Sequence, residues 1–407
     1  MSKKILPIFV LTLFVAPQLL SAAVNETQLA SKEIKASINS SLAQAQEEAS
    51  ARNKLLLRAA RKNKPFEVKA LLLAGADINT KEEKTDKTPL YIASENGFEE
   101  IVDILLSHTT EKDANKRPVI DAKIPTGHTP LIIASGKGHL NIVKKLVDKR
   151  ASLSAQTNDY KFTALHFAIW AGKVSTAVYL IENSPKKYLE IRDTFSDTPL
   201  LLACDPHRDS IDPDMEEGRL ANVDRAKIIQ ALLDRDVNLN VYDGINTPLI
   251  LLLKDNKDAL ALKMIHKPTI DVNARDISGN TAMHYAKGKI IIDALRLKGA
   301  LIDPRNKHDT TPLLYAASRG DLFIVQYLKS LGANIKATDK SGENALFYAI
   351  HSDTCNKKLI QYLVDNGVDT NVRNNRGRTL RQLLSGDYDE NVYCDSNEII
   401  NIIYPNK

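Results

Sequence analysis

The sequence predicts an all-α protein that forms a solenoid, in which paired helices repeat along the chain. A short unit, Thr-Pro-Leu-Leu-Tyr-Ala-Ala at 311–317, recurs in similar form at a nearly constant spacing. Each copy holds two apolar stretches that suit two short helices, and in this copy Gly320 and Gly332 stand where those helices would end. A unit of this size cannot bury its apolar side alone, so it needs neighbouring copies to pack against.

The residue that opens the first helix of each unit sets the period. It is threonine in eight of nine aligned copies, and a threonine hydroxyl can cap a helix N-terminus. Most neighbouring copies are 30 to 35 residues apart, and the two exceptions are gaps of 41 and 49 residues. The nine opening residues are Thr88, Thr129, Thr163, Thr198, Thr247, Thr281, Thr311, Asn344 and Thr379.

This pattern resembles the ankyrin repeat family, whose period is about 33 residues. The motifs that carry the resemblance are Thr-Pro-Leu at 88–90, 129–131, 198–200, 247–249 and 311–313, with Thr-Ala-Leu-His at 163–166 and Thr-Ala-Met-His at 281–284. The resemblance covers residues 53–404 and implies an ankyrin-repeat solenoid of about ten helix-turn-helix repeats with short hairpin loops. It also implies that His166 and His284 are structural imidazoles that hydrogen-bond the turn.

The N-terminus has the pattern of a secretory signal peptide over residues 1–23. Lys3 and Lys4 precede an apolar run, and Ser21-Ala22-Ala23 predicts cleavage after Ala23. The alternative is a membrane anchor, but a run of about 16 residues that contains prolines is short for spanning a bilayer. We therefore expect no stable membrane insertion after cleavage.

Residues 24–52 form a different kind of segment. Ile34, Ile38 and Leu42 recur at helical spacing among polar residues, which predicts an amphipathic, partly ordered leader helix that covers the first repeat. The alternative is a dimerising coiled coil, although the stripe is shorter than three heptads.

The predicted repeat domain runs from 53 to 404. Its first and last repeats are atypical, as expected of caps with one wetter face. Two insertions, at 109–122 and 204–222, explain the two long gaps in the period.

Composition and motifs argue against several classes of function. The formal net charge is +5, and 5 − 2 = +3 remains without Lys3 and Lys4, so no strong nucleic-acid footprint is expected. Glycine-rich nucleotide loops, His-Glu-x-x-His and Gly-x-Ser-x-Gly are all missing from the sequence. We therefore predict no enzyme activity, no catalytic residues, no cofactor, no metal and no small-molecule substrate.

The acidic insertion at 204–222 offers the alternative of a metal-binding or enzymatic protein. Asp212, Asp214 and Glu216 have the alternating spacing that opens a calcium loop. Gly218 then comes one place late, and Val223 stands where a bidentate glutamate belongs. A solvated loop is therefore the preferred interpretation.

The three cysteines allow one disulfide in an exported chain. Cys355 and Cys394 each precede the second helix of their repeat, so they face the same edge of the stack. A bridge between them is possible only if the loop at 387–395 folds back, and the alternative is three free thiols. Cys204 would remain a buried thiol.

The predicted docking surface lies on the hairpin tips and first helices of repeats four to six, because ankyrin partners usually meet this concave side. Apolar and aromatic side chains gather there and give way to polar residues elsewhere, as at the core and rim of an interface. The alternative is that some of these rings pack against neighbouring hairpins. The protein-binding residues are Tyr160, Phe162, Trp170, Phe195, Tyr242 and Ile245, with Ile277 on the next hairpin.

These features predict an exported ankyrin protein of bacterial type that binds another protein as a non-catalytic scaffold. The signal peptide predicts the periplasm or secretion as its location. A secreted effector that acts on host proteins is the competing destination. The partner itself cannot be read from the sequence.

Overall fold

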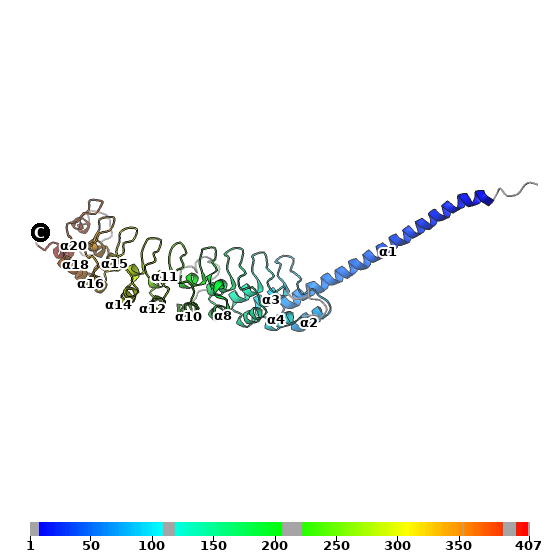
Figure 1. Ribbon diagram of the computed structural model, residues 1–407, viewed down its shortest axis with the longest axis horizontal. Helices are drawn as coiled ribbons and strands as arrows, with labels where there is room; N and C mark the ends of the chain where they lie inside the picture. Colours follow the sequence, from blue (N-terminus) through cyan, green and yellow to red (C-terminus); the bar gives the residue numbers. More distant parts are fainter. Residues whose placement is uncertain (1–7, 109–118, 206–221, 353, 386–395, 406–407) are drawn as a thin grey trace, which may run out of the picture. The chain divides into compact units, whose positions relative to one another are not determined.

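The computed structural model describes residues 8–108, 119–205, 222–352, 354–385 and 396–405, with the backbone alone for most of 8–34, for 222–224 and for 396. All named elements in these ranges are helices, as predicted, and they form ten consecutive pairs (Figure 1). The chain divides into two compact units, residues 1–122 and 123–407, which are described separately.

The first unit holds two helix pairs. Its helices are α1 (Ile8–Arg61), α2 (Pro65–Leu73), α3 (Pro89–Asn96) and α4 (Glu99–Ser107). The last turns of α1 form the first helix of repeat one, so the leader continues into the repeat without a break at residue 52. Leu56 is buried where α1 packs on α2 and α3.

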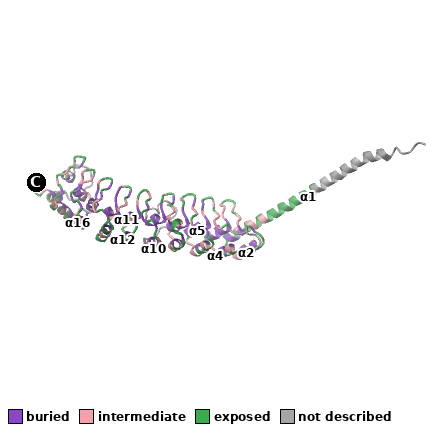
Figure 2. Cartoon of the chain, in the orientation of Figure 1, coloured by how far each residue is buried: buried purple, intermediate pink, exposed green. Residues whose placement is uncertain are grey.

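The leader differs from the expectation in one respect. Ile38 and Leu42 are 58% and 57% exposed, so their apolar stripe does not cover the first repeat (Figure 2). Covering would require α1 to fold back along the repeat, whereas α1 is one uninterrupted helix.

The second unit holds eight pairs in chain order. The first helices are α5 (Pro130–Lys137), α7 (Ala164–Trp170), α9 (Pro199–Cys204), α11 (Pro248–Lys254), α13 (Ala282–Tyr285), α15 (Pro312–Ser318), α17 (Ala345–Ile350) and α19 (Leu380–Leu384). The second helices are α6 (Leu140–Asp148), α8 (Val174–Asn183), α10 (Asn222–Leu233), α12 (Asp258–His266), α14 (Lys289–Leu297), α16 (Leu322–Ser330), α18 (Lys357–Asp365) and α20 (Ser396–Ile403). A 3-10 turn, η1 (Lys186–Glu190), follows α8.

The helix-opening threonines cap their helices as predicted. The Thr311 hydroxyl accepts a hydrogen bond from the Leu314 N–H, and Pro312 occupies the first turn, where no backbone donor is needed. Asn344 does the same for α17 by accepting from the N–H groups of Leu346 and Phe347. The local signal that set the period is therefore the contact that begins each first helix.

The core of the second unit runs between the helix layers. First helices pack on first helices and second helices on second helices, as α5 does on α7 and α6 on α8. Leucine, isoleucine and valine at the inward positions are almost fully buried (Figure 2). Each repeat thus completes the core of its neighbours, as a solenoid requires.

Two predicted features fall outside the described residues. Most of each insertion, 109–118 and 206–221, lies there, and so does Cys394. The acidic loop and the Cys355–Cys394 bridge therefore stay predictions. Cys204 is buried and free, and burial raises the pKa of its thiol, which keeps it protonated and unreactive.

Candidate protein-interaction surface

The hairpins that join the repeats are built on short polar turns. The Asp193 carboxylate accepts hydrogen bonds from the N–H groups of Phe195 (2.8 Å) and Asp197 (2.9 Å). In repeat seven, Asp276 accepts in the same way from Ser278 and Asn280. An acidic or amide side chain at the start of the turn satisfies backbone donors that would otherwise lack a partner.

Successive hairpins are also tied tip to tip. The Thr194 N–H donates to the Tyr160 carbonyl (3.0 Å), the Ile277 N–H to the Ile245 carbonyl (2.8 Å), and the Lys307 N–H to the Ser278 carbonyl (2.9 Å). These backbone bonds fix the spacing between neighbouring tips. Side chains at the tips therefore project from a surface that is formed before any partner arrives.

Three of the predicted rings come together in repeats four and five. Tyr160 stacks on Phe195, with ring centroids 6.1 Å apart, and both rings are half-buried. Phe162 was also predicted to face a partner, but it is only 4% exposed and stacks on His166. Phe162 is therefore a packing residue, because its ring fills the space beneath the hairpin instead of projecting from it.

Trp170 is half-buried at the end of α7. Its indole stacks on Phe167, with ring centroids 5.7 Å apart and planes inclined by 11°. Phe167 is not among the residues predicted from the sequence. The feature of the sequence that could have pointed to Phe167 is Gly136 in the preceding repeat. A side chain there would collide with the Phe167 ring, since a Cβ on Gly136 would lie 2.1 Å from that ring.

The most exposed predicted residues lie on the hairpin of repeat six and on the tip of the next hairpin. Tyr242 is 40% exposed and Ile245 is 49% exposed, and Ile277 on the next tip is 51% exposed. This hairpin is one residue shorter than its neighbours: Asp243 stands four places before Thr247, whereas Asp276 stands five before Thr281. The Tyr242 hydroxyl donates to the Gly244 carbonyl (2.6 Å), which holds the ring over the turn.

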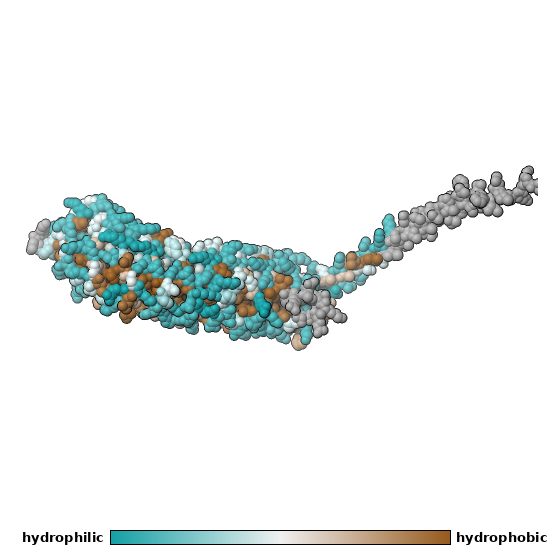
Figure 3. Space-filling view, viewed as in Figure 1, coloured by the Kyte–Doolittle hydropathy of each residue, from teal (hydrophilic) through white to brown (hydrophobic). Residues whose placement is uncertain are grey.

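A second apolar patch was missed by the sequence analysis. It lies on the second helices of repeats seven and eight and on the segment that follows α14, where Figure 3 shows brown surface near the helices labelled α14 and α16 in Figure 1. Position in the second helix could have revealed it, since an outward position there is normally polar. The patch consists of Ile290, Leu297, Leu301 and Phe323, which are between 57% and 81% exposed.

The two predicted structural histidines link each repeat to the next. In His284, Nδ1 accepts from the Thr281 N–H (3.0 Å) and Nε2 lies 3.1 Å from the Thr310 carbonyl, which fixes a neutral ring with the proton on Nε2. His166 makes the same pair of contacts with Thr163 and Asp197. Burial lowers the pKa of each imidazole to about 4.

The ion pair of repeats six and seven is also satisfied within the fold. Asp276 accepts from the Tyr285 hydroxyl (2.7 Å) and lies 3.5 Å from the Lys254 ammonium, which also sits over the Tyr285 ring. Burial would raise the pKa of Asp276, but the bonds from Tyr285 and Asn280 outweigh it and lower that pKa. This cluster stabilises the first-helix layer and leaves no acid or base poised for chemistry.

Neither a metal cluster nor a membrane-spanning helix occurs in the described ranges. No three histidine, cysteine, aspartate or glutamate side chains converge there in a way that could hold an ion. No helix among the residues covered by the structure is both long and apolar enough to span a bilayer.

Comparison with known families decides the classification. A family model described as "Ankyrin repeats (3 copies)" matches residues 29–117, 56–157, 116–193 and 287–374, which together exceed half of the chain. The chain belongs to the ankyrin repeat family. Members of this family are generally non-enzymatic scaffolds.

The similar curated proteins are diverse in their names. This ankyrin chain is 24% identical over 319 residues to E3 ubiquitin-protein ligase KEG of Arabidopsis thaliana, covering 74% of this chain and 18% of that protein. It is 28% identical over 216 residues to neurogenic locus notch homolog protein 1 of Homo sapiens, covering 48% and 8%. It is 27% identical over 157 residues to L-asparaginase of Dirofilaria immitis, covering 30% and 26%. The chain therefore spans no more than about a quarter of each of these relatives.

Proposed function

We propose that this ankyrin repeat protein is an exported, non-catalytic scaffold that binds a partner protein through the hairpin tips of repeats four to six. The family supports protein binding in general. The choice of surface depends on Tyr242 and Ile245, which are exposed on the same hairpin. This hairpin is hydrogen-bonded at its tip to the next one. A rigid apolar surface with a tyrosine loses little ordering entropy when it is covered.

The proposed surface is smaller than the set predicted from sequence. Tyr242 and Ile245 form its centre, and half-buried Tyr160, Phe195 and Trp170 line its flank. Phe162 is left out because it is buried.

Partner capture with matched variants tests the surface. Tyr242→Ser with Ile245→Ser should reduce recovery of the partner at least tenfold, because the centre of an interface supplies most of its binding energy. Ile290→Ser with Phe323→Ser, on the second helices, is the matched control and should leave recovery unchanged. If the control loses the partner and the tip variant keeps it, the second-helix patch is the docking surface and the proposal is wrong.

The proposed route is export by the signal peptide at 1–23, with the periplasm or the medium as destination. Fractionation of the source cells, followed by N-terminal sequencing, tests this part separately. A mature chain that begins at Val24 outside the cytoplasm supports export. An uncleaved chain retained in the cytoplasm contradicts it.

The alternative of a metal-binding or enzymatic protein depends on the acidic insertion. Deleting residues 206–221 separates the two ideas, because a scaffold should bind its partner as before. A metal-binding or enzymatic activity that is lost when the loop is deleted would favour the alternative.

A further inference from the structure

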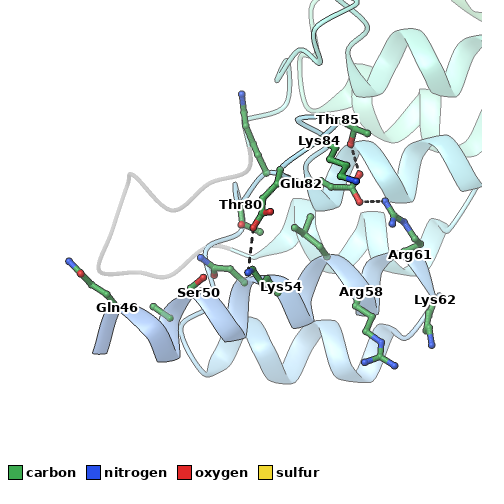
Figure 4. A pocket seen from close by; sticks show the side chains of 15 residues that line it. Gln46, Ser50, Lys54, Arg58, Arg61, Lys62, Thr80, Glu82, Lys84 and Thr85 are labelled. Atoms are coloured by element: carbon green, nitrogen blue, oxygen red, sulfur yellow. Dashed lines mark hydrogen bonds and ion pairs between the residues drawn. The ribbon is translucent and has the colours of Figure 1, made fainter. Parts of the chain in front are cut away.

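The first unit contains a cavity that the proposed function does not use, but its charged groups serve the fold. It lies between the last turns of α1 and the hairpin at 80–85, and its volume is about 1080 Å³ (Figure 4). Arg61 pairs with Glu82, and the Lys54 ammonium lies 3.4 Å from the Glu83 carboxylate. These ion pairs join the two walls, so they hold the hairpin against α1.

The second-helix patch of repeats seven and eight has no such role within the fold. Its four residues, Ile290, Leu297, Leu301 and Phe323, are between 57% and 81% exposed. Ile290 and Leu297 are two turns apart, and both lie on the side of α14 opposite its buried residues. Side chains exposed to this degree project from the helix layer and do not line a hollow.

α14 and α16 are held together beside the patch by one polar cluster. The Tyr327 hydroxyl of α16 donates to Asp293 of α14. The Lys289 ammonium lies 2.8 Å from the same carboxylate and 4.9 Å from the centre of the Tyr327 ring. Ile290 and Phe323 are each the second residue of their helix, so they stand one repeat apart on the same side of the second-helix layer. The acid beside the patch is therefore paired, and the apolar side chains form one surface.

The same positions are polar in three other second helices of equal length. α4, α6 and α18 each have nine residues, as α14 and α16 do. Their second residues are Glu100, Asn141 and Lys358, and their last residues are Ser107, Asp148 and Asp365. Packing between repeats thus needs no apolar side chain at these positions, and the patch indicates a contact outside the chain.

Positive charge surrounds the patch. The second helices α12, α14 and α16, each counted with the residue that follows it, carry six cationic residues and two acidic ones, an excess of 6 − 2 = 4. Lys263, Lys298 and Lys329 bond side-chain amide or backbone carbonyl oxygens. Because these acceptors are neutral, the bonds fix the ammonium groups without neutralising their charge. The six cations are Lys263, Lys267, Lys289, Arg296, Lys298 and Lys329.

Shape and charge together narrow the kind of occupant. A second copy of this chain would bring two cationic patches together, and like charges across an interface repel. Side chains that project offer no groove to a partner's peptide. Isoleucine, leucine and phenylalanine surrounded by lysine and arginine instead match an anionic bilayer. Its headgroups attract the cations, and the boundary of its acyl chains accepts the apolar side chains.

We infer that the second-helix face of repeats seven and eight adsorbs to the surface of an anionic phospholipid bilayer, with Ile290, Leu297 and Phe323 entering the headgroup layer. The contact is peripheral and needs no spanning helix. It is a second site, beyond the tip surface proposed for repeats four to six. Within the second unit, Figure 1 shows the second helices and the hairpin tips on opposite sides, so a chain held at a membrane keeps its tips available to a protein.

Tryptophan fluorescence of the full chain tests this inference at the patch itself. Phe323→Trp places a reporter on the patch, and Trp170 gives the same background in every variant. Vesicles of phosphatidylglycerol and phosphatidylcholine with brominated acyl chains should quench the reporter, because bromine quenches only on close approach. Vesicles of brominated phosphatidylcholine alone should need at least tenfold more lipid for half-maximal quenching. Raising the salt from about 0.05 M to 0.5 M should weaken the effect of the anionic vesicles several-fold.

Phe66→Trp is the matched reporter in the first unit. Phe66 is 86% exposed and is the second residue of α2, as Phe323 is of α16. Its neighbouring second helix, α4, is acidic and carries Glu99, Glu100 and Asp103. This reporter should not be quenched, although it lies nearer in sequence to the apolar N-terminal run. Quenching at position 323 alone therefore separates adsorption by the patch from adsorption by the N-terminus.

Charge-matched variants of the Phe323→Trp chain test the role of the cations. Lys263→Gln with Arg296→Gln should raise the lipid concentration for half-maximal quenching about tenfold. Lys307→Gln with Lys340→Gln removes the same charge from two exposed lysines on the hairpin tips and should leave that concentration unchanged. Melting curves check that both variants keep the parent fold.

Three results would overturn the inference. The first is equal quenching of the two reporters, including no quenching of either. The second is equal quenching by the anionic vesicles and by phosphatidylcholine alone, and the third is an equal effect of the two charge-matched pairs. None of these results depends on Tyr242 or Ile245, so failure here is distinguishable from failure of the tip surface.

Discussion

At the scale of single residues, the fold depends most on the hydrogen-bonding residues at the helix starts. Thr379 and Gln382 at α19 show the same reciprocal cap that Thr281 and His284 form at α13, with glutamine in place of histidine. The histidine adds one contact, from Nε2 to the carbonyl of Thr310 in the next hairpin. A neutral imidazole is needed for this, because Nδ1 must accept while Nε2 donates.

The first prediction concerns pH and His284. The folded-state pKa of about 4 lies below the ordinary value of about 6.5, so the unfolded chain takes up a proton first as the pH falls. The stability that the neutral ring contributes is full above pH 6.5 and is lost between pH 6.5 and 4, by about 3 kcal/mol for each such histidine.

His284→Gln keeps the cap and removes this titration. Urea unfolding at pH 7.5, 6 and 5 should show a smaller loss of stability in the variant than in the parent. Parallel pH profiles for the two proteins would contradict the assigned burial of the imidazole.

At the scale of elements, helix contacts depend on small residues that allow close approach. Gly136 in α5 lies under the Phe167 ring of α7, and that ring stacks on Trp170. Glycine lowers the propensity of α5 for helix, but it gives the space that the ring occupies.

The second prediction is that Gly136→Ala destabilises the protein by about 1 kcal/mol. Overpacking costs about 1–3 kcal/mol, which exceeds the gain of 0.5–1 kcal/mol from placing alanine in a helix. Trp170 is the only tryptophan, so its emission should shift as Phe167 is displaced. An alanine variant that melts higher than the parent, with unchanged emission, would show that the ring does not lie over Gly136.

At the scale of the whole molecule, the repeats make stability a sum of local contributions. In the second unit each helix pair contacts its neighbours in sequence, as α16 contacts α18, so effects should fade within a repeat or two. An apolar side chain on the surface of the solenoid stays exposed, because no distant part of the fold packs over it.

The third prediction tests this additivity. Leu146, Leu328 and Leu363 are buried in α6, α16 and α18, and each change to alanine should cost about 2–5 kcal/mol. Leu146→Ala with Leu363→Ala should add to within about 0.5 kcal/mol, because their repeats do not touch. Leu328→Ala with Leu363→Ala, in adjacent repeats, should deviate by more. Equal coupling in both pairs would mean that the second unit unfolds as one globular core.

Much of this architecture could be predicted from the sequence. The Thr-Pro-Leu spacing located the first helices, and glycine marked the ends of some of them, such as α3 and α5, because capping and turn formation depend on residues close together in the chain. The family resemblance supplied the structural role of the two histidines, and each bonds a threonine three residues before it.

The sequence could not predict which individual side chains of the hairpins are exposed. Phe162 and Tyr242 are aromatic residues of hairpin regions, yet the first is buried and the second is exposed.

The sequence alone therefore determined the repeat, its period, the helix starts and the family, all of which rest on contacts within about one repeat. The tertiary structure decided which rings point outward and which glycine admits a ring from the next repeat. These outcomes depend on how separate repeats pack side by side, and that packing is set by the shapes of many side chains together.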